Sequence, residues 1–378
     1  MNKKYVLLIR GNSERDFAMK TWIEMGRGVI VIDTPISNPT KIADYYLFVR
    51  DIFNSREVIL NLENFLNKNK NIEIECVYCF YDANIEVAVD ISRHINTPFM
   101  NQKQALTLSN KSLFRNLIKD TNPQIKYKII SENSKYYNDI DYPIVVKPTN
   151  RSGSQGVKQI NNNEEFINHA SYLFSLPRAT EIIIESYIFG IEHSAEVIIL
   201  DENNFRIMGI FKKNVTSPPY FVELEHTYLG DHLNNSLLQD QLNIVISNII
   251  KDLELSRTII HIEFKSQEGK INIIECNPRI AGDYIPDLLY QITGINLYKE
   301  YIDLQSKNYE FPNNYKTGKI GYVKFAKSEY EYFNILSSLQ NTQNEQIFRL
   351  GFSPTKGSDL MNNEDRRGYF IVLSTDSD

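Results

Sequence analysis

The chain has 378 residues, of which 42% are hydrophobic and 23% charged, as expected for a folded globular protein with room for two or three domains. The formal net charge of -6 argues against a nucleic-acid binder, because such proteins usually carry a basic excess. Three cysteines are too few for a disulfide framework and favour a reducing compartment. No apolar run is long enough for a membrane span or a signal peptide, so we expect a cytoplasmic protein.

The first hundred residues alternate between strand and helix patterns. We expect strands over residues 5–10, 28–33 and 74–81 and a helix over residues 84–94. A helix is also expected to begin near Ser13, with Asp16 three residues later as in a capping box. This alternation predicts a parallel sheet with helices on its faces. The Gly11-Asn12-Ser13 turn either cradles an anion at the helix start or only connects strand to helix.

Cys76 and Cys79 formally make a C-x-x-C pair inside one of these strands. No second pair accompanies them, so we interpret them as half-buried strand residues rather than as a redox or zinc motif.

The rest of the chain holds a second mixed segment and then a β-rich one. A helical stretch over residues 101–120 is expected to break near residues 109–110. The expected strands that follow are 143–148, 157–160, 181–185, 192–200, 205–213 and 220–226, with helices over 164–174, 235–253, 285–293 and 296–304. A hairpin lies between residues 261 and 277, and a small β-containing tail ends with residues 367–373.

The hairpin places oxygen ligands in two otherwise apolar strands. It reads HIEFKSQEGKINIIECNPRIAGD from His261, so that Glu263, Glu275 and Asn277 interrupt apolar runs. Carboxylates in apolar strands are costly unless something binds them, and a hard divalent cation prefers such oxygens. The alternative is that the three residues face solvent on an exposed sheet surface.

The turn decides whether the three ligands share a face. Glu275 and Asn277 are two residues apart and therefore point to the same side of their strand. A regular two-residue turn at Glu268-Gly269 would put Glu263 on the opposite side. If the metal site is real, we therefore predict an odd-numbered loop or a β-bulge.

A lysine and a small-residue loop suggest a phosphate site. The run YPIVVKPTNRSGSQG delivers Lys147 from an apolar strand, and a loop with Ser152, Gly153, Ser154 and Gly156 follows. Backbone N–H groups of such a loop can wrap phosphate oxygens. The run is neither a Walker P-loop nor a dinucleotide fingerprint. A plain surface loop is the alternative.

A strand connection offers groups for a nucleoside. In EIIIESYIFGIEHSAE, Glu185 ends one strand, Ile188 lies in the linker and Glu192 opens the next strand. Backbone atoms there can bond a flat base, and the carboxylates can accept from an amino group or ribose hydroxyls. Solvated glutamates on an ordinary connection are the alternative.

Together these motifs resemble the ATP-grasp superfamily of carboxylate–amine ligases, from about residue 111 to 373. The resemblance implies an α/β chain, α+β in its catalytic part, with the ATP-grasp fold. It implies an N-terminal doubly wound α/β domain (1–100), a helical linker (101–125), a lid subdomain (126–190) and a C-terminal antiparallel-sheet catalytic domain (191–378).

By this resemblance ATP is bound with Mg²⁺, as two ions for which Mn²⁺ can substitute. Lys111 and Lys147 would contact phosphates beneath the loop of Ser152, Gly153, Ser154 and Gly156. Glu185 and the backbone near Ile188 would recognise adenine, and Glu192 would bind the ribose. The metal would be held by Glu263, Glu275 and Asn277, and Arg279 would steady the transferring phosphate.

Within the superfamily the chain looks most like the L-amino acid ligases that make dipeptides, on the run PYFVELEH at residues 219–226 and on the segment after the hairpin. This likeness implies that Glu223 and His226 face the substrate, together with Gly282 and Asp283. Strict strand alternation would instead put His226 on the face opposite Glu223. Asp283 either admits a bulkier or basic substrate or only anchors its loop.

The implied reaction is ATP- and Mg²⁺-dependent joining of a carboxylate, here an amino acid, to an amine through an acyl phosphate. The partners would be small molecules, with no nucleic acid and no membrane, and a homodimer is common among relatives. One alternative is a different acceptor, such as a carrier-protein thiol, an amino sugar or a nucleotide precursor. The other is a nucleotide-binding regulator without turnover.

Overall fold

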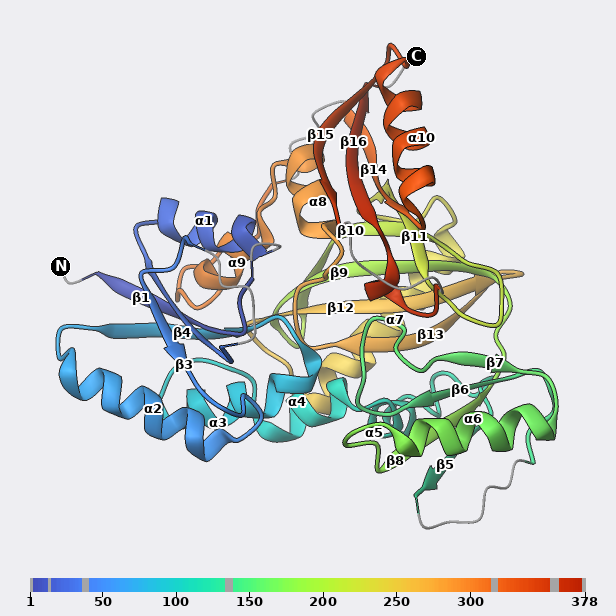
Figure 1. Cartoon of the computed structure of the whole chain (residues 1–378), viewed down its shortest axis with the longest axis horizontal. Helices are drawn as coiled ribbons and strands as arrows, with labels where there is room; N and C mark the ends of the chain where they lie inside the picture. The colour runs from blue at the N-terminus through green and yellow to red at the C-terminus, as the bar shows by residue number, and fades with distance from the viewer. Residues whose placement is uncertain are drawn as a thin grey trace.

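The structure, a computed structural model, describes residues 3–12, 15–35, 41–132, 139–313, 319–353 and 360–375. It is built on three sheets with helices packed on their faces (Figure 1). Within these ranges no helix combines the length and apolar character needed to cross a bilayer.

The N-terminal sheet is parallel and has the strand order β3-β2-β1-β4. Its elements are β1 (Lys4–Ile9), α1 (Asp16–Glu24), β2 (Gly28–Asp33), β3 (Tyr45–Phe48), α2 (Ser55–Lys68), β4 (Glu73–Cys79), the short helix η2 (Asp82–Asn84) and α3 (Ile85–Ile95). The predicted parallel sheet is confirmed, although β3 and α2 were not expected. Ser13 lies outside the described residues. Cys76 and Cys79 are buried free thiols in β4.

Two short helices then lead to the second sheet. They are α4 (Gln102–Ser109) and α5 (Lys111–Leu117), so the predicted break is confirmed. Asn110 makes the break because its side chain accepts hydrogen bonds from the backbone N–H groups of Ser112 and Leu113, as an N-cap does. This cap makes Lys111 the first residue of α5 and fixes its backbone.

The second sheet is small and antiparallel, with the order β5-β8-β6-β7. Its elements are β5 (Tyr127–Ser131), β6 (Ile144–Pro148), β7 (Lys158–Ile160), α6 (Asn163–Ser175) and β8 (Glu181–Ser186). Helix α6 covers one face through Phe166, Ala170 and Leu173, and the loop between β6 and β7 contains the small residues predicted to meet phosphate.

The third sheet has eight antiparallel strands in the order β13-β12-β9-β10-β11-β14-β16-β15. Its elements are β9 (Ile191–Asp201), β10 (Asn204–Val215), β11 (Glu223–Gly230), α7 (Ser236–Leu253), β12 (Thr258–Gln267), β13 (Lys270–Asn277), α8 (Ile285–Thr293), α9 (Leu297–Asp303), β14 (Lys319–Ala326), α10 (Glu329–Gln340), β15 (Glu345–Phe352), η3 (Asn363–Asp365) and β16 (Gly368–Thr375). The expected β tail is thus three strands of this sheet.

The two faces of the large sheet differ in chemistry. One face is apolar and packs on α7 through residues such as Ile246 and Ile262. The register brings the charged and polar side chains of β9 to β13 to the other face: Glu192, Glu196, Lys213, Glu223, His226, His261, Glu263, Glu275 and Asn277. Period-two alternation explains this division.

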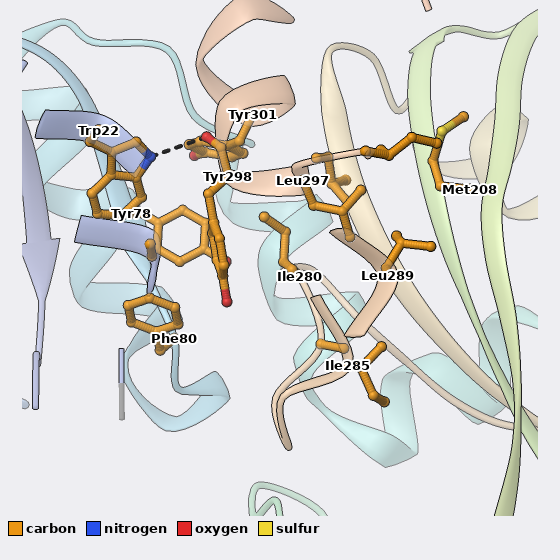
Figure 2. Close-up of a cluster of buried hydrophobic side chains, with 14 of the residues drawn as sticks. Trp22, Tyr78, Phe80, Met208, Ile280, Ile285, Leu289, Leu297, Tyr298 and Tyr301 are labelled. Carbon is orange, nitrogen blue, oxygen red and sulfur yellow. Dashed lines mark hydrogen bonds between the residues drawn. The ribbon is translucent and has the colours of Figure 1, made fainter. Parts of the chain in front are cut away.

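An apolar core joins the N-terminal sheet to the large sheet (Figure 2). Trp22 of α1 is fully buried, packs edge-on against Tyr78 and Tyr298, and donates its indole N–H to the Tyr298 carbonyl at 3.1 Å. Beyond Tyr298 the core continues through Leu289 and Met208 to the large sheet. This packing fixes one wall of the space between the sheets.

Replacing Trp22 with alanine is expected to lower the free energy of unfolding by about 3–5 kcal/mol, because it leaves a cavity and an unsatisfied carbonyl. Urea titration followed by far-ultraviolet circular dichroism measures this, since Trp22 is the sole tryptophan and its loss removes the fluorescence signal. Ile23→Ala, at a neighbouring side chain that is 39% exposed, should change stability by no more than about 0.5 kcal/mol. Equal losses in both variants would contradict the packing role of Trp22.

Candidate functional site

A β-bulge in β13 brings the three predicted metal ligands to one face. The turn itself has two residues, Glu268 and Gly269, both with positive φ, so the loop is not odd-numbered. The register then shifts between the pairs Phe264–Ile273 and Glu263–Glu275, which leaves Ile274 as an extra residue. The predicted bulge is confirmed, and Glu263 lies directly opposite Glu275.

A second β-bulge, in β11, brings two predicted substrate residues, Glu223 and His226, to one face of the sheet. Val215 pairs with Glu223 and Asn214 with Glu225, so the residue between these glutamates has no partner. Glu223 and His226 therefore share a face, and strict alternation fails here. His226 is fully buried, and its Nε2 lies 3.1 Å from Glu223 Oε2, although neither ring nitrogen makes a well-aligned hydrogen bond.

Lys213 lies at the centre of the polar face and was not recognised from the sequence. Its Nζ is 2.8 Å from both Glu223 Oε1 and Glu263 Oε2, and 3.5 Å from Glu192 Oε1. Burial alone would lower the pKa of Lys213, but the three carboxylates raise it well above its usual value. The only sequence signal was a lysine at an inward position of a strand.

The two carboxylates among the predicted metal ligands are paired with lysines. Glu275 Oε2 is 3.0 Å from Lys111 Nζ, and Asn277 donates its side-chain N–H to Glu275 Oε1 at 3.1 Å. Burial alone would raise the pKa of Glu275 and Glu263, yet Lys111 and Lys213 respectively hold both pKa values below normal. Two facing carboxylates and an amide oxygen are the hard donors that Mg²⁺ prefers, so these residues fit the ion.

Behind Glu263 lies a buried carboxylate–histidine pair. His261 Nδ1 is 2.5 Å from Glu196 Oε1, and His261 Nε2 is 3.2 Å from Glu263 Oε1. The second oxygen of Glu196 accepts the backbone N–H of Ala281 at 3.1 Å. Burial opposes charge on the ring, but the carboxylates raise the pKa of His261 to about 9. The arrangement ties Glu263 to the loop that carries Arg279.

Lys147 takes part in a buried ion-pair cluster. Glu185 lies between two cations, with Lys147 Nζ 2.6 Å from one oxygen and Arg115 Nε 2.6 Å from the other. Burial alone would raise the pKa of Glu185, but Arg115 and Lys147 lower it to about 2. Glu185 therefore orients Lys147, and Arg115, which the sequence did not single out, anchors this cluster to the bulge by donating to the carbonyls of Ile273 and Ile274.

Arg279 meets a carboxylate from the N-terminal sheet. Its Nε and Nη2 bind Asp82 at 2.8 and 2.7 Å, and its Nη1 donates to the Ile280 carbonyl. Burial alone would lower the pKa of Arg279, but Asp82 raises it further above its already high value. Asp82 was not expected from the sequence, because 197 positions separate the partners.

The predicted nucleoside residues lie beside two lysines. The Ile188 carbonyl accepts from Lys265 Nζ at 3.3 Å, and Glu192 lies 3.6 Å from Lys265 and 3.5 Å from Lys213.

The small-residue loop between β6 and β7 borders a cavity that lies between the three sheets. Gly153, Ser154 and Gly156 all have positive φ, and a Cβ at Gly156 would lie 2.7 Å from a Leu173 methyl. Glycine is therefore required at position 156. We call residues 152–156 the lid loop.

A cavity of about 1530 Å³ lies between the three sheets, and part of the predicted site lines it: Ser152, Gly153, Glu223, Glu263, Glu275, Arg279, Gly282 and Asp283. The other predicted residues do not line it: Lys111, Lys147, Ser154, Gly156, Glu185, Ile188, Glu192, Asn277 and His226. Its lining includes Arg279 and Glu275 at one place, the lid-loop residues Ser152, Gly153 and Gln155 at another, and Gly282 with Asp283 at a third. Asp283 is paired with Arg366 of the C-terminal segment, at 2.7 and 3.0 Å. The predicted residues that line this cavity thus surround a space that is large enough for a nucleotide and a further ligand.

Comparison with known proteins identifies this arrangement. Residues 140–287 match the family model described as the ATP-grasp domain. The match includes Lys147, the lid loop, Glu185, Glu192 and the whole hairpin.

Solved structures of low sequence identity share the fold. An L-amino acid ligase from Bacillus licheniformis superposes with a TM-score of 0.79 at 14% identity, covering 100% of this chain and 95% of that one. A phosphoribosylglycinamide synthetase from Anaerococcus prevotii gives 0.65 at 17% identity, covering 99% and 95%. An N5-carboxyaminoimidazole synthetase from Staphylococcus aureus complexed with ADP gives 0.72 at 14%, covering 99% and 94%. The expected α/β chain with the ATP-grasp fold is confirmed.

Curated relatives match over shorter stretches. An uncharacterized protein, y4rH, from Sinorhizobium fredii is 29% identical over 170 residues, which are 44% of this chain and 34% of that protein. The carbamoyl phosphate synthase large chain of a Thermoanaerobacter species is 24% identical over 202 residues, 50% of this chain and 18% of that protein. This chain therefore spans about a third or less of these relatives.

Glu185→Gln should lower the free energy of unfolding at pH 7 by about 3–5 kcal/mol, because it leaves two buried cations uncompensated. The folded pKa of Glu185, about 2, lies below its ordinary value of 4.5. Its stabilising contribution is therefore complete above pH 4.5 and is lost as the pH falls toward 2. Urea titrations at several pH values test this, and the gap between wild type and variant should narrow in acid. Glu132→Gln, at an exposed strand-end glutamate, is the control; a gap that does not depend on pH would contradict the ion-pair account.

Proposed function

We propose that this chain, which contains an ATP-grasp domain and has the ATP-grasp fold, is an ADP-forming ligase that joins a carboxylate to an amine. The observation that carries this proposal is the bulge-restored face of β12 and β13, where Glu263, Glu275 and Asn277 converge beside Lys111. Such a face has one chemical use that fits all of its members, which is to hold a divalent cation and the phosphates it bridges.

In this proposal ATP lies between the small sheet and the large sheet. Lys111 and Lys147 neutralise its phosphates beneath the lid loop. Glu185 holds Lys147 in place and, together with the backbone near Ile188, forms the adenine pocket. Glu192 accepts from the ribose hydroxyls. The proposal also keeps the division of the chain that the resemblance implies, into an N-terminal domain, a helical linker, a lid subdomain and a catalytic domain.

Glu263, Glu275 and Asn277 would hold Mg²⁺, which when bound supplies charge neutralisation on the phosphates. Lys111 and Lys213 now neutralise these two carboxylates. With Mg²⁺ held by these carboxylates, Lys111 and Lys213 would be free to donate to phosphate oxygens. The carboxylates can therefore stay ionised in a buried place both before and after nucleotide binding.

The reaction needs little covalent participation from the protein. A substrate carboxylate oxygen attacks the γ-phosphorus, and the bond to the β-phosphate oxygen breaks, giving an acyl phosphate and ADP. The amine then attacks the acyl carbon, loses a proton and expels inorganic phosphate from the tetrahedral species. Arg279 steadies the transferring phosphoryl group, and the lid loop excludes water, in which acyl phosphates hydrolyse.

An amino acid is the proposed acyl donor, and formation of a dipeptide or related amide the proposed outcome. Glu223 lines the cavity together with Gly282 and Asp283, and the buried His226 lies 3.1 Å behind it, so the carboxylate of Glu223 is placed to bind a substrate amino group. The fold shared with an L-amino acid ligase supports this choice. Neighbours that include a phosphoribosylglycinamide synthetase keep a different acceptor as the second candidate.

The direct test is release of ADP and phosphate from MgATP in the presence of paired L-amino acids. Some pair should stimulate ADP formation and yield a dipeptide detectable by mass spectrometry. Stimulation only by a carrier-protein thiol, an amino sugar or a nucleotide precursor would replace the dipeptide assignment. ATP binding without ADP formation in any mixture would support a regulator instead.

Glu275→Gln is expected to reduce ADP formation about a hundredfold or more, because it weakens the metal-holding face without altering side-chain volume. The rate is measured by coupled ADP detection, with folding checked by circular dichroism. Glu268→Gln, in the exposed turn of the same hairpin, should retain the wild-type rate. Normal turnover in Glu275→Gln would remove the metal assignment.

A further inference from the structure

One short segment near the C-terminus touches both the lid loop and the substrate end of the cavity. We call residues 362–366, which include η3, the C-terminal clamp. The Asn363 backbone N–H donates to the Gly153 carbonyl at 3.1 Å, and the Asn363 side chain accepts the backbone N–H of Glu223 at 3.0 Å. A single residue thus bonds to the loop over the nucleotide and to the first residue of β11.

A second bond strengthens the connection with the lid loop. Gln155 donates its side-chain N–H to Glu364 Oε1 at 2.9 Å. The lid loop is therefore held at two points, one through backbone atoms and one through exposed side chains. The two points are independent, so either can be removed without the other.

The clamp carries hydrogen bonds of its own. Asn362 caps η3, and the Asp365 carboxylate accepts from the backbone N–H groups of Met361 and Asn362 at 3.0 and 2.9 Å. Such reciprocal capping fixes a short turn. A rigid turn can transmit the position of one contact to the other, whereas a flexible one could not.

Arg366 fixes the substrate side of the clamp. Its guanidinium binds both oxygens of Asp283, at 2.7 and 3.0 Å, and donates to the Glu223 carbonyl at 3.3 Å and the Asn363 carbonyl at 2.8 Å. It also lies 3.7 Å from the centre of the Phe325 ring. A bidentate, stacked arginine is held more firmly than a lysine would be.

The residue that Arg366 holds has an unfavourable backbone. Asp283 and Tyr284 both have left-handed φ values, 51° and 60°, and they follow Gly282, whose Cα faces open space. Consecutive non-glycine residues in this region persist only where neighbours hold them, and such places cluster at functional sites. The bidentate Arg366–Asp283 pair holds this turn together with the 3.6 Å contact of His226 with Asp283 and the stacking of Tyr284 on Tyr369.

We propose that Arg366 is a positioning and specificity-determining residue: it keeps Asp283 as an anchor of the substrate wall, and the C-terminal clamp ties that wall to the lid loop. The proposal rests on the proposed function in taking this wall as the substrate pocket. Asp283 is then not a receptor for a basic substrate, because Arg366 already occupies its carboxylate. The lid loop and the substrate wall move as one unit.

The connection between the C-terminal clamp and the lid loop is tested by an experiment that does not depend on enzyme activity. Trypsin cleavage after Arg151, beside the lid loop, is followed by mass spectrometry of the intact folded protein. Glu364→Ala removes the bond to Gln155 and should speed this cleavage about fivefold, the effect of one hydrogen bond. Glu329→Ala, at an exposed glutamate of α10, should leave it unchanged. An unchanged rate in Glu364→Ala would overturn the tie, whatever the enzyme's reaction is.

The specificity role is tested by substrate preference. Arg366→Gln removes the bidentate partner of Asp283 and leaves only its 3.6 Å contact with His226, so use of L-lysine relative to L-methionine should rise about tenfold in ADP formation. Arg366→Lys keeps the positive charge without the bidentate geometry, so its ratio should lie between those of the wild type and Arg366→Gln. Arg206→Gln, at an arginine that stacks on Phe311 outside the cavity, is the control. An unchanged preference in a folded Arg366→Gln would overturn the proposal. Absence of ADP formation in the wild type would instead contradict the proposed function and leave the trypsin test decisive.

Discussion

The ammonium group of Lys213 holds the polar face of the large sheet together. It contacts one carboxylate from each part of the proposed site: Glu192, proposed to meet the ribose, Glu223, proposed to meet the substrate, and Glu263, a proposed metal ligand. Three carboxylates buried so close together would repel one another. Lys213 offsets part of this repulsion because its ammonium group lies between them, and the large sheet can therefore keep acidic groups on a buried face.

Local sequence was enough to predict most of the architecture, because its cues act over a few residues. The alternation of strands and helices predicted the parallel N-terminal sheet, and Asn110 marked the break between α4 and α5. The bulge in β13 was predicted by requiring that Glu263 and Glu275 share a face. No such requirement was applied to β11, and there strict alternation gave the wrong face for His226. The face on which a strand residue lies can be inferred across a bulge only where a chemical requirement fixes the face of one residue on each side of it.

Two of the missed residues, Asp82 and Arg115, have partners that are remote in sequence. Asp82 binds Arg279 across 197 positions, and Arg115 and Glu185 are 70 apart. A lone charged residue in a sequence looks the same whether it faces solvent or a buried partner. Only the packing of sheets against one another distinguishes the two cases. The motifs located the site, and the ion pairs that hold it emerged only from the fold.

The apolar core of Figure 2 has a consequence for synthesis of the chain. Trp22 donates its hydrogen bond to Tyr298, which the ribosome adds 276 residues later. At roughly 5–20 residues per second, tens of seconds pass before α9 can cover that face of the N-terminal sheet. During this interval Trp22 and Tyr78 lack their final neighbours. The nascent N-terminal segment therefore exposes an aromatic surface to chaperones or to misassembly until Tyr298 has been added.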